Sequence, residues 1–173
     1  MIARRTAALL AATVLAAALA ACAPTASPTP SPTATGFASE EEAFAAAEAT
    51  YRAYVDALNE VDLSDPATFE PVYSHLSGEA LDSEKRTLTQ MHSDGWAVSG
   101  DTTLPAIFEG EGLGELVVCQ NVSEVDVRDA EGTSQVAADR PDVFALEVRV
   151  VFDPSSDTNA RVAESQAVQD SRC

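Results

Sequence analysis

Residues 144–152 read FALEVRVVF. Phe, Leu or Val occupies positions 144, 146, 148, 150 and 152, and these residues alternate with Ala145, Glu147, Arg149 and Val151. A repeat of two puts the large side chains on one face of a β-strand, which packs on a core while the other face meets solvent. The stretch therefore predicts a strand of an antiparallel sheet that has one covered face.

Three further stretches on either side of it predict strands. One runs from Trp96 unevenly toward Phe108, with Pro105 marking an edge or a bulge. A second runs from Glu115 to about Asp129, with a bulge expected near Ser123. A third spans 160–168, after the turn-forming residues DPSSD at 153–157. Together these stretches predict an antiparallel sheet of about four strands.

The residues before the strands predict helices. Ser39 followed by Glu42 is a capping box, and apolar residues at three- and four-residue steps continue the helix from about 40 to 60. Pro66 suits the first turn of a second, shorter helix. A third helix is expected from 79 to 93, with Gly95 as its stop. The fold class is therefore α+β, with N-terminal helices packed on a curved antiparallel sheet.

The N-terminus has the zones of a secretory signal: Arg4 and Arg5, an apolar run over 6–19, and small residues before Cys22. The letters LAAC at 19–22 resemble the lipobox of bacterial lipoproteins. That resemblance implies a diacylglycerol group on Cys22 and cleavage before it. An ordinary signal cut after an Ala-x-Ala pattern is the alternative, and the export route, Sec or twin-arginine, stays open.

These features divide the chain into three parts. Residues 1–21 are a lipoprotein signal peptide, residues 22–37 a disordered Pro/Thr/Ser-rich tether, and residues 38–173 a single α+β domain. Two acyl chains anchor a protein stably, since each buried methylene contributes about 0.8 kcal/mol. We therefore expect an extracytoplasmic protein that is held at the bacterial cell membrane by lipid on Cys22.

The chain is strongly acidic. Its formal net charge is −18, and removal of residues 1–21 takes away Arg4 and Arg5 but no acid, which leaves −20. Such a surface repels nucleic acid and anionic headgroups, so neither is an expected partner. It favours cations and basic partners, although solubility and spacing in a polyanionic envelope is the preferred explanation of the charge.

Two cysteines remain once Cys22 carries lipid. Cys119 lies in an apolar, strand-like run, and Cys173 is the last residue of the sequence. An oxidising compartment allows the two to pair. We expect a disulfide between them, with two free or separately used thiols as the alternative.

The order of elements over residues 39 to about 168 resembles the nuclear-transport-factor-2-like, or cystatin-like, superfamily. The residues that carry the resemblance are the capped helix beginning at Ser39, the two shorter helices and the strands after Trp96. It implies a sheet that wraps the helices into a cone, often around a pocket. Enzymes of the superfamily, such as ketosteroid isomerase and polyketide cyclases, use acidic residues and tyrosine inside the cone. No aspartate here aligns with theirs, so no catalytic residue is assigned.

The remaining polar and aromatic residues favour structural roles. We expect the glutamates of a glycine-rich loop to be solvated; they are Glu109, Glu111 and Glu115. The two histidines, His75 and His92, are expected to be structural. The 153–159 segment, with Asp153, Asp157 and Asn159, is expected to be a plain hairpin turn. Neither a metal centre nor a cofactor is expected, since ligand spacing is lacking. Tyr51, Tyr54 and Trp96 fit a core, or else the lining of a pocket.

Two functions fit these observations. The first is a membrane-anchored envelope lipoprotein that displays an acidic, non-enzymatic domain, whose partner is an envelope protein, a wall component or a small apolar ligand. The second is a tethered enzyme of the ketosteroid-isomerase or polyketide-cyclase type. The second requires a carboxylate in a water-poor cavity with a raised pKa, whereas the first does not.

Overall fold

A computed structural model describes Phe37 and residues 39–173. The predicted signal peptide, Cys22 and the rest of the predicted tether lie outside the described residues. Within the described part, no helix has both the length and the apolar character needed to cross a bilayer.

The helices form where the sequence predicts them. They are α1 (Glu40–Asn59), a 3₁₀ turn η1 (Pro66–Thr68), α2 (Phe69–Ser74) and α3 (Gly78–Ser93). The Ser39 hydroxyl accepts a hydrogen bond of 3.1 Å from the Glu42 backbone N–H, as the capping box predicts. The predicted second helix begins as the 3₁₀ turn at Pro66 and continues as α2.

The strands form two antiparallel sheets. The larger has the order β2 (Thr103–Glu109), β3 (Glu115–Asn121), β5 (Val143–Phe152) and β6 (Ala160–Val168). The smaller pairs β1 (Ala97–Ser99) with β4 (Asp126–Arg128). The larger sheet stays open, and helices precede strands in the chain, so the α+β class is confirmed.

The stretch from Trp96 to Phe108 forms two strands, which corrects the prediction of one. The chain turns at Gly100, whose φ is +79°, and the Glu124 carbonyl lies where a Cβ at Gly100 would stand. The side chain of Asn59 then holds Thr102 by donating to its C=O and accepting from its N–H, each at 2.9 Å. These contacts replace ladder hydrogen bonds, so β1 and β2 join different sheets.

The expected bulge near Ser123 is also wrong. The Asn121 side chain accepts a hydrogen bond of 2.9 Å from the Ser123 N–H, and the Val125 N–H donates to the Val122 carbonyl at 3.0 Å. This turn ends β3 at Asn121. The apolar residues that follow it form β4, which pairs with β1 instead.

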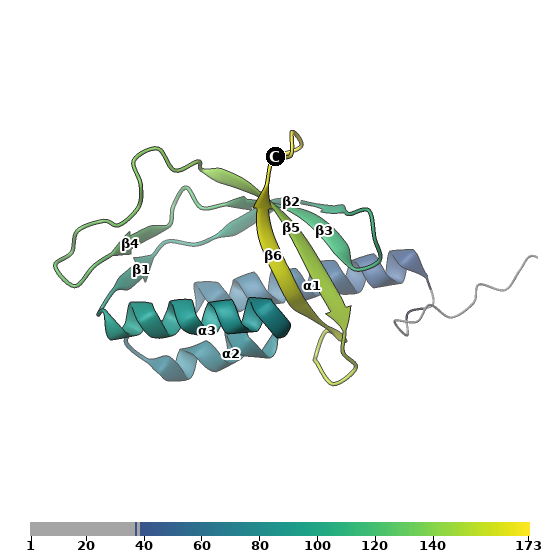
Figure 1. The fold of residues 1–173 in the computed structure, drawn as a ribbon, viewed down its shortest axis with the longest axis horizontal. Helices are drawn as coiled ribbons and strands as arrows, with labels where there is room; N and C mark the ends of the chain where they lie inside the picture. The colour runs from purple at the N-terminus through teal and green to yellow at the C-terminus, as the bar shows by residue number, and fades with distance from the viewer. Residues whose placement is uncertain (1–36, 38) are drawn as a thin grey trace, which may run out of the picture.

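The helices cover one face of the larger sheet, and the core lies between them (Figure 1). The predicted alternation holds at the centre of β5, where Val148 and Val150 are buried while Glu147 and Arg149 are exposed. It does not hold at the end of the strand, because Phe152 is 38% exposed. The buried core comprises Ala47, Tyr51, Val55, Leu63, Phe69, Val72, Leu76, Leu88, Leu116, Val118, Val148, Val150, Ala160 and Val162.

The C-terminal segment is fastened to β3. Cys119 and Cys173 form the predicted disulfide, with their Cα atoms 5.3 Å apart. Cys119 belongs to the sheet face opposite Val118 and is only 2% exposed, whereas Cys173 is exposed. The guanidinium of Arg172 lies 4.8 Å from the ring centroid of Phe108 in β2, which adds a second contact for the chain end.

Phe37 packs edge-on against Phe152, with ring centroids 5.2 Å apart. The first turn of α1 lies at the end of the domain away from the β1–β4 pair (Figure 1).

Candidate functional site

A cavity of about 360 Å³ lies between α3, α1 and the helix-facing side of the sheet. Pockets for small ligands typically occupy about 300–1,000 Å³. The wall contains three glutamates, two tyrosines and several neutral polar residues; it is formed by Tyr51, Tyr54, Leu76, Glu79, Ala80, Ser83, Glu84, Gln120, Leu146, Val162, Glu164, Ser165 and Gln166. We call it the polar cavity.

Glu84 lies at the centre of the site because of its place on α3. It follows Ala80 by four residues and precedes Leu88 by four, so it shares the helix face that packs inward. The Tyr54 hydroxyl donates a hydrogen bond of 3.2 Å to Glu84 Oε2. Burial raises the pKa of Glu84 above its usual 4.5, and the hydrogen bond from Tyr54 opposes this only in part.

The two tyrosines come from adjacent turns of α1. Tyr51 is 1% exposed, and its hydroxyl donates to Gln120 Oε1 on β3 at 3.0 Å. Gln120 faces the cavity because it follows the core residue Val118 by two positions along the strand. Burial raises the pKa of both tyrosines, so each hydroxyl keeps its proton at neutral pH and can donate.

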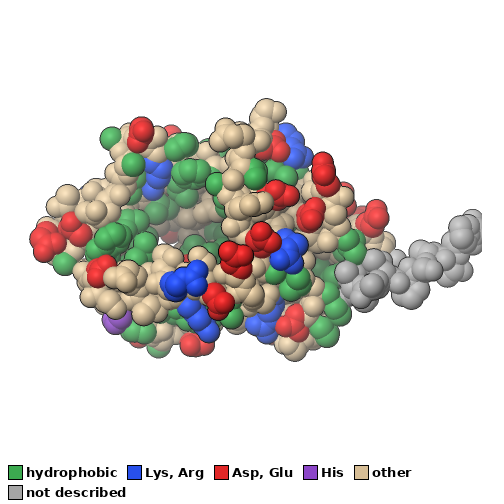
Figure 2. Space-filling view, in the orientation of Figure 1, with side chains coloured by type: hydrophobic (Ala, Val, Ile, Leu, Met, Phe, Trp, Pro, Cys, Tyr) green, Lys and Arg blue, Asp and Glu red, His purple; other side chains and the backbone are tan. Residues whose placement is uncertain are grey.

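A second cavity, of about 340 Å³, adjoins the first at Glu84, which belongs to the wall of both. Its wall contains many apolar side chains and consists of Leu58, Asn59, Val61, Leu63, Glu84, Thr87, Leu88, Met91, Val98, Ser99, Gly100, Asp101, Thr102 and Val125. We call it the apolar cavity. Figure 2 shows the molecule hollowed between α3 and the β1–β4 pair, with hydrophobic side chains around the hollow.

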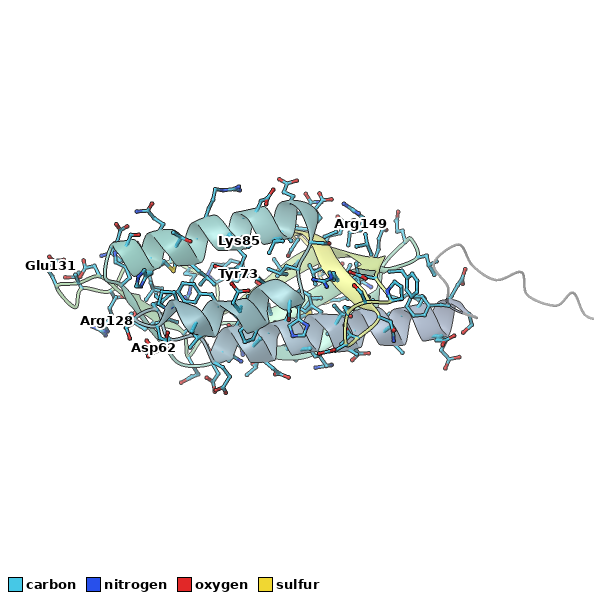
Figure 3. The ribbon with its side chains drawn as sticks, turned by 90° about the horizontal axis from the view of Figure 1, so that it is seen from below. Asp62, Tyr73, Lys85, Arg128, Glu131 and Arg149 are labelled. Atoms are coloured by element: carbon cyan, nitrogen blue, oxygen red, sulfur yellow. A yellow bond between two sulfur atoms is a disulfide. The ribbon has the colours of Figure 1, made fainter. Side chains whose placement is uncertain are left out.

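Negative charge dominates the polar cavity. Of its three glutamates, Glu164 forms an exposed ion pair with Arg149 at 3.1 Å. None of the described residues that line either cavity is a lysine or an arginine. Lys85 follows Glu84 on α3 but points to α2, where its Nζ lies 5.2 Å from the ring centroid of Tyr73 (Figure 3).

The structure gives the predicted aromatic residues different places. Tyr51 serves both interpretations, since its ring packs in the core while its hydroxyl reaches the polar cavity. Tyr54 packs against the core and also lines this cavity. Trp96 packs against the core at its margin and belongs to the wall of neither cavity.

Neither histidine belongs to the wall of the polar cavity or of the apolar cavity. His92 Nδ1 makes a hydrogen bond of 2.7 Å with the Leu63 carbonyl, which ties α3 to the segment before the 3₁₀ turn. His75 ends α2, and burial lowers its pKa. The hydrogen bond of His92 is thus a contact between two elements of the fold.

The acidic loops are separate from the cavities as well. Glu109, Glu111 and Glu115 surround a small hollow beside the start of α1. Asp153 accepts from Arg161 at 2.6 Å and from the Ser155 backbone N–H at 2.9 Å, within the β5–β6 hairpin turn. Within residues 37 and 39–173, no three His, Cys, Asp or Glu side chains converge in a way that could hold a metal ion.

Sequence reasoning missed Glu84, although a signal exists. The predicted third helix has an apolar stripe that includes Ala80, Leu88 and Met91, and Glu84 interrupts this stripe at helical spacing. A charged residue on the inward face of an amphipathic helix needs a partner or a cavity. The partner, Tyr54, is on another helix, so the sequence alone does not identify it.

Comparisons with known proteins leave the family open. No protein-family profile matches the chain, and no curated protein matches it. One similar solved structure is a de novo designed β-sheet protein determined by solution NMR, which is 14% identical and covers 75% of this chain and 90% of its own. Its TM-score of 0.32 is too low to carry an argument about fold or function.

Proposed function

We propose that this chain is a lipoprotein of the bacterial cell envelope, anchored outside the cytoplasm by acyl chains on Cys22, whose domain binds a small, largely apolar ligand. The letters LAAC at 19–22 and the Pro/Thr/Ser tract after them support the anchor. The helices-then-sheet order supports a relationship to the nuclear-transport-factor-2-like superfamily.

The observation that carries the binding function is the pair of cavities that meet at Glu84. Two adjoining pockets of several hundred Å³, each partly open to solvent, leave side chains of a small domain without the packing partners that a filled space would supply. A ligand of matching shape recovers those contacts and releases water from the apolar walls. Among the partners considered from the sequence, a small apolar ligand therefore fits better than a protein or a wall polymer.

The test is binding of N-phenyl-1-naphthylamine, a neutral apolar dye that fluoresces out of water. Residues 37–173 serve as the sample, because the whole described core lies within them. We expect saturable fluorescence that Thr87→Trp, at the wall of the apolar cavity, reduces at least tenfold in affinity. Gln90→Trp, on the same helix but outside the wall of the apolar cavity, leaves it unchanged. Dye binding that is absent, or equal in both variants, would contradict the proposal.

Glu84 also favours a second candidate function, the tethered enzyme. A carboxyl group with a raised pKa beside a tyrosine hydroxyl in a cavity is the arrangement a general base needs. In this role Glu84 removes a proton next to a substrate carbonyl. The Tyr54 hydroxyl, which donates to Glu84 in this structure, turns its single proton to the developing oxyanion when substrate is bound.

A β,γ-unsaturated ketone serves as the test substrate, since its conjugated product absorbs in the ultraviolet. The enzyme candidate predicts turnover that Glu84→Gln abolishes and that Tyr54→Phe lowers by about 10²-fold, as the loss of one oxyanion donor does elsewhere. Absence of turnover by the unaltered domain rejects this candidate for such ketones and leaves the binding function standing.

A further inference from the structure

Resting on the proposed binding function, we propose that the ligand is a cationic amphiphile, whose ammonium head lies against Glu84 in the polar cavity and whose aliphatic chain fills the apolar cavity.

The shape of the site is the reason to expect an amphiphilic ligand. Among the described residues, Glu84 is the one shared by the walls of both cavities, so both cavities reach this side chain. The proposed ligand passes beside Glu84 from one cavity into the other. One side offers hydroxyl, amide and carboxylate groups, including those of Tyr51 and Gln120. The other offers apolar side chains such as Leu58, Val61 and Met91. A molecule with a polar head and an apolar chain matches this division.

The charge of the site is the reason to expect a cationic head group on the ligand. Within residues 37 and 39–173, Glu79 and Glu84 have no ion pair, and the Arg149 guanidinium offsets only Glu164. A carboxylate has about four acceptor positions. The Glu84 side chain uses one of them for Tyr54, so acceptor capacity remains for the N–H groups of an ammonium. An anionic head would meet glutamates there with no lysine or arginine among the described lining residues.

The charge of the whole domain acts in the same direction. A net charge of −18 over the chain attracts small cations and speeds their encounter with the site. Attraction of this kind is diffuse and weakens with salt, whereas a contact in a partly buried cavity is screened much less. The experiment must therefore separate the local contact with Glu84 from the general charge of the protein.

The experiment displaces N-phenyl-1-naphthylamine from residues 37–173 with three amphiphiles that share a twelve-carbon chain. The chain length is about the same as a common detergent tail, and the heads are ammonium (dodecylammonium), hydroxyl (dodecanol) and carboxylate (dodecanoate). All are used below the concentrations at which they form micelles, at fixed ionic strength. We expect dodecylammonium to displace the dye at a concentration at least tenfold below that of dodecanoate, since a charge-assisted hydrogen bond supports about that difference.

Glu84→Gln and Glu131→Gln form a matched pair, because each removes one carboxylate. Glu131 lies at an exposed turn, at the far end of the domain from Arg149 (Figure 3). We expect Glu84→Gln to remove most of the preference for dodecylammonium over dodecanol and dodecanoate, with each displacement measured relative to the affinity of that variant for the dye. Glu131→Gln should keep the preference.

The outcomes separate this inference from the function on which it rests. Dye binding with equal displacement by all three amphiphiles overturns the cationic head and leaves the binding function intact. A preference that Glu84→Gln and Glu131→Gln lower equally also overturns the inference, because diffuse charge then explains it. Failure of the dye to bind the unaltered domain removes the binding function itself.

Discussion

Removing the disulfide is the change whose consequence follows most directly from the structure. Cys119 and Cys173 are 54 residues apart in sequence, and the bond between them closes that length of chain. Cys173 is exposed, so Cys173→Ser breaks the bond without opening a hole in the core. Cys119 is 2% exposed, so Cys119→Ser also buries a hydroxyl in an apolar place.

The chain-entropy account predicts a loss of about 4 kcal/mol in the free energy of unfolding for a closed loop of this length. A domain of ordinary stability has about 5–15 kcal/mol in all, so Cys173→Ser should consume a large part of it. Cys119→Ser should cost about 1–3 kcal/mol more, because its hydroxyl lacks water as a partner.

Urea unfolding of residues 37–173, followed by the fluorescence of Trp96, measures these losses. The dependence on urea should also steepen in Cys173→Ser, since an unfolded chain without the cross-link exposes more surface. Reduction of the unaltered domain with dithiothreitol should reproduce the same loss. A loss below about 1 kcal/mol for Cys173→Ser would refute this reasoning, because it would mean that closing the loop hardly restricts the unfolded chain.

Three further predictions follow from other parts of the chain. Cys22→Ser should abolish incorporation of an alkyne-labelled palmitate in bacteria, and label that persists would refute the lipid anchor. Because folding raises the pKa of Glu84 above 4.5, its contribution to stability is complete below about pH 4.5 and declines as pH rises through the folded-state pKa. As pH rises from 4 to 7, the free energy of unfolding of Glu84→Gln should therefore increase relative to that of the unaltered domain, as measured by urea titration at each pH. A difference between the two free energies that is independent of pH would contradict the burial of this carboxyl. Gly100→Ala should lose more than about 2 kcal/mol of stability, because it combines a strained φ of +79° with a clash against the Glu124 carbonyl. The control is Gly132→Ala, where φ is +81° and the space around the added methyl group is open, so that only the backbone strain applies. Equal losses in the two variants would argue against the clash.

Local patterns were sufficient for most of the fold. The alternation over 144–152 and the capping box at Ser39 each depend on residues only a few positions apart, and the structure confirms β5 and α1 where they were predicted. The same patterns were insufficient at Gly100, where the strand breaks because Asn59 and Glu124, far away in sequence, occupy its backbone surroundings.

The sequence by itself determined the order of helices and strands, the face that each presents to the core, and the acidic character of the chain, since these depend on side-chain chemistry repeated at short, regular intervals. Only the tertiary structure decided that β1 and β4 leave the main sheet, and that Glu84 of α3 meets Tyr54 of α1 at the junction of two cavities. The physical reason is that a cavity and its hydrogen bonds are properties of the space between elements. That space is set by how whole helices pack on the sheet, and no single stretch of sequence records it.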